Sequence, residues 1–175
     1  MRHMSTIMYL LQLLGNPGKR KDFFLSLRFN LISMSFKFLE KIAIADIAFE
    51  VTAKTRDGLF EQAGLAASDI IFNPKTVKQK VKKKIELKAD SLEHLLYDFL
   101  SEIIYLKDTD GLLFSKYKIK VTEDDGGFML SCLAAGEKID RKRHDLRNDL
   151  KAITMHMFVV EKRKSGWYAR VVVDI

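Results

Sequence analysis

The sequence predicts an α+β fold: a two-layer sandwich in which one mostly antiparallel β-sheet is covered by two helices, with a β-hairpin at the carboxyl end. Two segments place apolar residues at spacings of three and four, as amphipathic helices do, and most other segments alternate apolar and polar residues, as half-buried strands do. The later strands also follow one another across turns or a single polar connection, which favours antiparallel pairing.

Residues 1–33 are expected to lie outside this fold, and residues 34–175 to form a single domain. We interpret residues 1–33 as a translated leader or an over-long start, disordered or loosely packed. A secretory signal peptide and an amphipathic membrane anchor are the alternatives. The signal peptide is disfavoured because the basic segment 15–21 stands where a cleavage site would need small residues.

The first two strands are predicted at 36–39 and 47–54, where apolar residues alternate with others. Thr55 is a suitable N-cap for the helix that follows, in which apolar residues recur at helical spacing as far as Ile71. Asn73–Pro74 then ends this helix, since a residue that precedes proline is unfavourable in helical conformation.

A lysine-rich strand is predicted at 77–88, with a cationic face in which Lys80, Lys82 and Lys84 alternate with other residues. One interpretation is a solvated outer face or a charged edge strand that prevents edge-to-edge pairing. The other is a row of RNA phosphate contacts, although the aromatic residues that would stack on bases are missing from it.

The second helix is predicted to begin with Asp90 as its N-cap and Glu93 at its third position, and to break at 108–111. Four further strands are predicted at 117–121, 128–134, 152–162 and 167–174. A polar connection at 137–148 joins the second of these strands to the third.

Positive charge is concentrated in parts of the chain rather than spread over it. The formal net charge is +7 and the pI about 9.4, values that suggest a polyanionic partner. Residues 1–33 hold five basic residues and one acid, and residues 75–88 hold seven lysines and one glutamate. The basicity is therefore local, and the rest of the domain is slightly acidic.

Several function classes are excluded by what the sequence lacks. Cys132 is the only cysteine, so no disulfide within the chain and no thiolate metal cluster can form, and we expect a reducing compartment, the cytoplasm. No apolar run reaches the roughly 18 to 20 residues of a membrane span. The sequence contains no Gly-rich phosphate loop, nucleophile elbow or His-Glu-x-x-His motif.

The leading candidate site is the carboxyl end of the chain. Asp174 directly precedes Ile175, so a side-chain carboxylate and the terminal carboxylate lie on adjacent residues at the end of a strand. Such groups repel unless a cation or a donor lies between them. Asp46, at the start of the second strand, would join them if the first and last strands of the sheet meet.

A site of this kind consists of oxygen ligands only, which suits a hard cation: Ca²⁺ first, with Mg²⁺ or Mn²⁺ as alternatives. The competing interpretation is purely structural. In it, Asp46 caps a turn and Asp174 simply ends a strand.

At these residues the sequence resembles the archease family, whose members assist the tRNA-splicing RNA ligase. The resemblance extends from Phe36 to Ile175. It rests on Phe38-Leu39-Glu40, Ala45-Asp46-Ile47-Ala48-Phe49, Lys54-Thr55, Leu59-Phe60-Glu61, Ser91-Leu92-Glu93-His94-Leu95-Leu96, Gly111-Leu112-Leu113-Phe114-Ser115, Lys151-Ala152-Ile153-Thr154-Met155-His156 and Val171-Val172-Val173-Asp174-Ile175.

The resemblance implies a non-catalytic, metal-binding protein that promotes guanylylation and multiple turnover of the ligase, and that meets RNA through the ligase. It implies that Asp46, Asp174 and Ile175 are the metal ligands, with His156, His144 and Lys151 as candidates for a supporting or partner contact. The chain departs from the family's pattern: Ala43 and Ile44 stand where the family has a His-Thr pair.

Two other classes of function are considered beside this one. Some archease relatives look like chaperones or specificity modulators of tRNA cytosine methyltransferases, and Lys80, Lys82 and Lys84 would then contact RNA directly. A hydrolase with a metal-activated water is disfavoured because the sequence offers no evident pairing of a nucleophile and a general base beside the acids. No membrane partner is expected, and the sequence does not determine the oligomeric state.

Overall fold

A computed structural model describes residues 35–39 and 46–175, which belong to one compact unit, Met34–Ile175. The predictions for residues 1–33, and the substitutions at Ala43 and Ile44, lie outside the described residues. None of the described helices is long and apolar enough to cross a membrane.

The described strands form two antiparallel sheets. In the four-stranded sheet the order is β1 (Ser35–Phe38), β2 (Asp46–Ala53), β7 (Gly166–Asp174) and β6 (Ala152–Arg163). In the three-stranded sheet the order is β3 (Val81–Ala89), β5 (Gly127–Lys138) and β4 (Leu112–Asp124). The first sheet therefore pairs strands from the two ends of the domain, whereas the second uses its middle.

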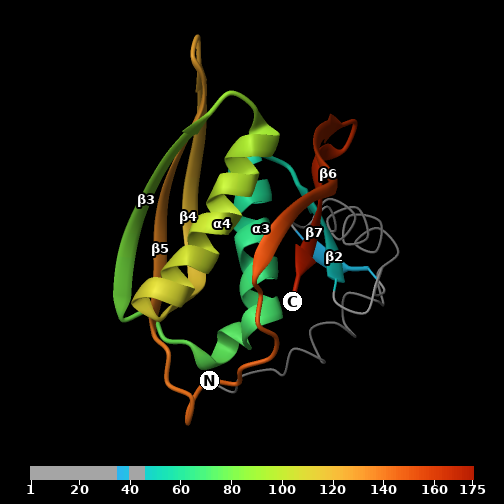
Figure 1. The fold of residues 1–175 in the computed structure, drawn as a ribbon. Helices are drawn as coiled ribbons and strands as arrows, with labels where there is room; N and C mark the ends of the chain where they lie inside the picture. Colours follow the sequence, from blue (N-terminus) through green and yellow to red (C-terminus); the bar gives the residue numbers. More distant parts are fainter. Residues whose placement is uncertain (1–34, 40–45) are drawn as a thin grey trace, which may run out of the picture. The chain divides into compact units, whose positions relative to one another are not determined.

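Two helices, α3 (Arg56–Ile71) and α4 (Leu92–Asp110), lie between the sheets (Figure 1). Helix α3 contacts β4 on one side and β2 on the other, and α4 contacts β3 and β6. A short 3₁₀-helix, Pro74–Thr76, follows α3. The predicted α+β class, the antiparallel pairing and the carboxyl-terminal hairpin are confirmed. The prediction of a single sheet in two layers is corrected to two sheets with the helices between them.

This arrangement follows from the apolar faces of the elements. The buried side chains of the helices include Phe60 and Phe99, and they pack against inward residues of both sheets, such as Val51 and Leu130. Because each helix meets a sheet on two sides, it needs a wider apolar surface than a helix that covers one sheet. Ser68 of α3 is buried within this core, where its hydroxyl lies 2.8 Å from that of Tyr117.

The helix ends are largely as predicted, with one correction. Thr55 caps α3 by accepting a hydrogen bond from the N–H of Gly58 (3.1 Å). The cap of α4 is Ser91, not Asp90, and its hydroxyl accepts from the N–H of His94 (3.2 Å). Asp90 lies one residue before this cap, and its carboxylate contacts the His94 ring (2.7 Å).

Some strand boundaries also differ from the prediction. Residues 77–80 precede β3 without pairing in the sheet, while β4 begins at Leu112 and β5 continues to Lys138. At the end of β5, Gly136 lies so close to the neighbouring strand that a Cβ would meet the carbonyl oxygen of Leu113. Only a glycine fits at this position, and through it β5 continues to pair beyond residue 134, where the alternation of apolar residues predicted the end of the strand.

Candidate functional site

The first and last strands of the domain bring two aspartates together. Strands β2 and β7 pair antiparallel, and their register sets Asp46 directly opposite Asp174. Side chains of directly opposed residues project from the same face of a sheet, with Cβ atoms about 4.5 to 5.5 Å apart. Both aspartates are half-buried, so two carboxylates share one small region at the end of the strand pair.

Several contacts hold the chain terminus beside this pair. The side chain of Ile175 packs against the hydrophobic core, and the backbone N–H of Lys151 donates to the carbonyl oxygen of Asp174 (2.9 Å). Strand β6 begins at the same level, since Ala152 pairs with Asp174. We call Asp46, Asp174 and the terminal carboxylate of Ile175 the acidic tip.

The acidic tip supplies three anionic groups, of which two are side chains. Within residues 35–39 and 46–175, no three His, Cys, Asp or Glu side chains lie together as a metal site would need. The terminal carboxylate is the group that the acidic tip adds to its two side chains. This donor set contains only oxygen, which suits Ca²⁺, Mg²⁺ or Mn²⁺ rather than a thiophilic metal.

A polar network that sequence reasoning missed lies on the same face of the strands. Glu50 accepts a hydrogen bond from the Tyr168 hydroxyl (2.6 Å) and another from Arg170 (3.0 Å). The Tyr168 hydroxyl, followed by Arg170, lowers the pKa of Glu50, and burial raises the pKa of Tyr168. In the sequence, Glu50 follows Asp46 by four residues, and Asp174 follows Arg170 by four residues. This even spacing is the only sequence signal of the network, and it indicates a shared face only once the register of β2 and β7 is known.

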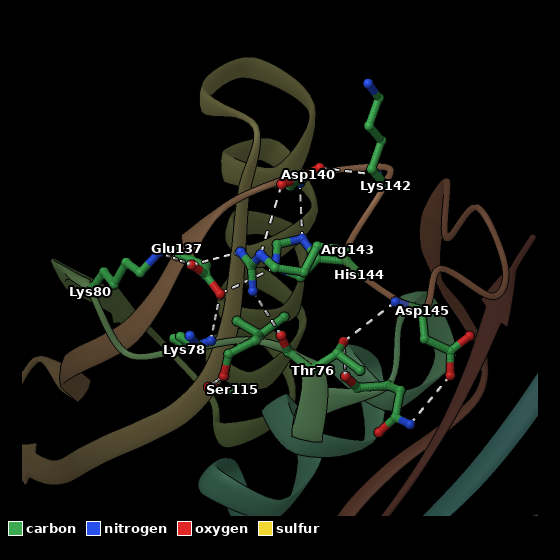
Figure 2. A network of polar contacts seen from close by, with 12 residues as sticks. Thr76, Lys78, Lys80, Ser115, Glu137, Asp140, Lys142, Arg143, His144 and Asp145 are labelled. Atoms are coloured by element: carbon green, nitrogen blue, oxygen red, sulfur yellow. Dashed lines mark hydrogen bonds and ion pairs between the residues drawn. The ribbon is translucent and has the colours of Figure 1, made fainter.

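The three supporting residues suggested by resemblance lie in different places. Lys151 adjoins the acidic tip through the backbone contact described above. His156 is exposed on β6, within a stretch where the register with β7 shifts between Thr154 and Val159. His144 is buried in the connection after β5, where its ring contacts Glu137 (3.2 Å) in a separate polar cluster (Figure 2). The structure thus gives His144 a partner other than the acidic tip.

Comparison with known proteins identifies relatives over most of the domain. The model of the Archease protein family (MTH1598/TM1083) matches residues 36–175. The Protein archease of Pyrococcus furiosus is 39% identical over 132 residues, which are 75% of this chain and 93% of that protein. The Protein archease of Methanosarcina barkeri is 37% identical over 132 residues, or 75% and 90% of the two chains.

Two solved structures are also similar. The solution structure of protein 1598 of Methanobacterium thermoautotrophicum matches with a TM-score of 0.71 and 32% identity, covering 80% of this chain and 98% of that one. A crystal structure described as an archease, possible chaperone, from Thermotoga maritima matches with a TM-score of 0.52 and 17% identity, covering 79% and 98%. At that identity the second match supports the fold alone.

Proposed function

Because the chain belongs to the archease family, we propose that it is a non-catalytic accessory protein that activates the tRNA-splicing RNA ligase. It would promote guanylylation of the ligase, so that the enzyme completes repeated rounds of joining in tRNA splicing and RNA repair. The observation that carries the proposal is the register pair of Asp46 and Asp174. These are the residues that resemblance matches to the family's acidic ligands.

A divalent cation fits the chemistry of the acidic tip, and Ca²⁺ is the first candidate. The carboxylates of Asp46, Asp174 and the chain terminus would hold it, with waters completing the six to eight oxygen ligands typical of Ca²⁺. Such an ion would supply positive charge that neutralises the tip and can attract phosphate oxygens.

Contacts within the chain hold the tip in place. Strand pairing orients both aspartates, the Ile175 side chain anchors the terminus in the core, and the Lys151 N–H holds the carbonyl of Asp174. A rigid group loses little entropy when it docks. The tip is therefore suited to entering the nucleotide and metal pocket of a partner enzyme and ordering phosphates there.

Action through a partner also agrees with the chemistry of Cys132. This cysteine is buried, and burial raises the pKa of its thiol to about 12, so the thiol stays protonated and poorly nucleophilic at neutral pH. Since the chain has no other cysteine, we infer that no thiolate intermediate forms on it.

Charge removal at the tip tests the proposal. Asp46→Asn and Asp174→Asn each remove one negative charge with little change of shape. We expect the far-ultraviolet circular dichroism to be unchanged and Ca²⁺ binding in calorimetry to weaken by about tenfold or more, since even loss of a ligand's supporting contact costs about that much. With excess cyclic-phosphate RNA, GTP and limiting cognate ligase, joining should stop after about one product per ligase.

The matched control is Asp125→Asn, the same change at an exposed residue in the turn between β4 and β5. It should behave as wild type. Addition of two glycines after Ile175 should act like the aspartate variants, because it replaces the terminal carboxylate at that position by a peptide group, and addition of the same residues before Met1 should not. Repeated joining by both aspartate variants would refute the proposal.

A further inference from the structure

The three-stranded sheet turns a regular array of lysines outward. On each rung of its outward face, a residue of the central strand β5 lies between one of β3 and one of β4. Ala135 lies between Lys82 and Lys116, and Leu133 lies between Lys84 and Lys118. The next rungs pair Glu86 with Lys120 across Ser131, and Lys88 with Thr122 across Met129.

We call these six residues, Lys82, Lys84, Lys88, Lys116, Lys118 and Lys120, the lysine face. All six are exposed, and one acid, Glu86, lies among them. Rungs on one face of a sheet recur about every 6.8 Å, and β3 and β4 are about 9.6 Å apart across β5. Because repulsion among so many like charges is unfavourable, the face should favour a partner with closely spaced negative charges.

The lysines without ion pairs gather at one end of the face. Lys84 pairs with Glu86 (2.7 Å), Lys88 with Asp124 (3.8 Å) and Lys120 with Asp57 (3.2 Å). In the part of the chain that the structure describes, the other three form no ion pair; these are Lys82, Lys116 and Lys118.

The same end of the sheet, where β3 begins and β5 ends, carries a basic pocket of about 680 Å³. Its basic lining residues outnumber the two acids, Glu137 and Asp140. They are Lys80, Lys138, Arg141, Lys142 and Arg143. A pocket of this size can take a group as large as a nucleotide.

Glu137 is a buried lining residue of this pocket, and Figure 2 shows its contacts with Lys78, Lys80, Arg143 and His144. One of its oxygens accepts from the backbone N–H of Lys78 (2.6 Å), and the other meets Lys80 (3.0 Å) and Arg143 (2.8 Å). The Asp140 N–H donates to Nδ1 of His144 (2.9 Å), which leaves the proton on Nε2 to be donated to Glu137. The Arg143 contact is foremost in lowering the pKa of Glu137, so the anchor stays ionised and holds two cations in place.

We propose that the lysine face and this pocket together bind the phosphate backbone of RNA. The centre of the face is aliphatic, with Met129 and Leu133 about 40% exposed and no aromatic ring among the described residues of its rungs. Bases therefore have no stacking platform there, and the contacts go to phosphates and sugars, without sequence preference. The choice of RNA over DNA rests on the proposed function, because the ligase joins RNA.

Edge protection accounts for part of this array. Strands β3 and β4 are both edge strands, and lysines on such strands discourage edge-to-edge pairing. It does not account for the pocket, where the exposed residues Arg141 and Lys142 lie in a connection, outside any strand. The positive charges of Arg141 and Lys142 lie at the same end of the sheet as the unpaired lysines. Together they form a continuous basic surface, along which an anionic chain can bind.

The test is direct binding of a fluorescein-labelled tRNA transcript, measured by anisotropy without ligase and without divalent metal. The triple variant Lys82→Glu, Lys116→Glu, Lys118→Glu should bind at least about 30-fold more weakly. Its plot of log affinity against log salt should be shallower by about 2 to 3 units, since each lost phosphate contact accounts for about 0.7 to 0.9. A second variant, Arg141→Ala with Lys142→Ala, should lose about fivefold or more.

The matched control is Lys54→Glu, Lys162→Glu, Lys164→Glu, which makes the same charge change at exposed lysines off this face. It should lose less than about threefold. The proposal is overturned if the two triple variants weaken equally, if the lysine-face variant keeps the tRNA affinity of wild type, or if wild type does not bind tRNA at 50 mM salt. Because this assay needs neither ligase nor metal, its failure is distinct from failure of the proposed function.

Discussion

At the scale of single residues, the buried carboxylate of Glu137 shows how one side chain can order a surface. It is 3% exposed, yet its partners Lys80 and Arg143 reach solvent with 61% and 36% of their side chains. Four donors meet its two oxygens, so the cost of its burial is offset by hydrogen bonds and charge. The sequence predicts only a polar connection at this position, because no local pattern marks a glutamate as buried.

The pKa of Glu137 leads to a prediction about stability and pH. A carboxyl whose pKa is lower in the folded than in the unfolded state stabilises the fold above the unfolded value, near 4.5, and loses this effect as the pH falls toward the folded value. We expect Glu137→Gln to lower the urea midpoint at pH 7, and the difference from wild type to shrink as the pH falls from about 5 to 3.

Glu161→Gln is the control for this prediction, since Glu161 pairs with Arg163 while 47% exposed. It should change the midpoint several times less than Glu137→Gln at pH 7, because exposed ion pairs add little. A Glu137→Gln midpoint that differs from wild type by the same amount at every pH would contradict the assigned cause.

At the scale of elements, local patterns predicted most helices and strands correctly. Thr55 and the apolar spacing after it located α3, and period-two alternation located β2 and β7. The failures were at boundaries: residues 77–80 alternate as a strand does but pair with no neighbour. Alternation reports which residues could form a strand, whereas pairing depends on what lies beside them.

The start of α4 provides a prediction at this scale. Ser91→Ala removes the acceptor for the His94 N–H and should lower the free energy of unfolding by about 1 kcal/mol in urea titration at pH 7. Asp90→Ala leaves this cap in place and should cost clearly less, since its side chain is 81% exposed. If the order of the two losses were reversed, Asp90 would be the cap, as the sequence alone suggested.

At the scale of the whole molecule, the two proposed surfaces lie on different sheets. The acidic tip belongs to β2 and β7, the lysine face belongs to β3 and β4, and the helices pack between the two sheets (Figure 1). In the two proposals, one chain thus meets two partners on separate sheets, with the ligase pocket at the metal-bound tip and RNA at the lysine face.

This separation predicts independent effects. Asp174→Asn should weaken Ca²⁺ binding and leave tRNA affinity within about twofold of wild type. The triple variant Lys82→Glu, Lys116→Glu, Lys118→Glu should weaken tRNA binding and leave Ca²⁺ affinity within about twofold of wild type. Calorimetry with Ca²⁺ and anisotropy with tRNA measure both constants for each variant and for their combination. If Asp174→Asn weakened tRNA binding as strongly as the lysine reversal does, the two surfaces would form one site.

The α+β class, the helices, the antiparallel hairpins and the candidate acids Asp46 and Asp174 are predictable from the amino-acid sequence, because each rests on periodicity or on neighbouring residues. The formation of two sheets, the pairing of Asp46 with Asp174, and the position of Lys116 and Lys118 on the other side of the strand that Lys82 and Lys84 flank are known only from the fold. Register between strands far apart in the chain depends on how the helices and both sheets pack together, which no local pattern encodes.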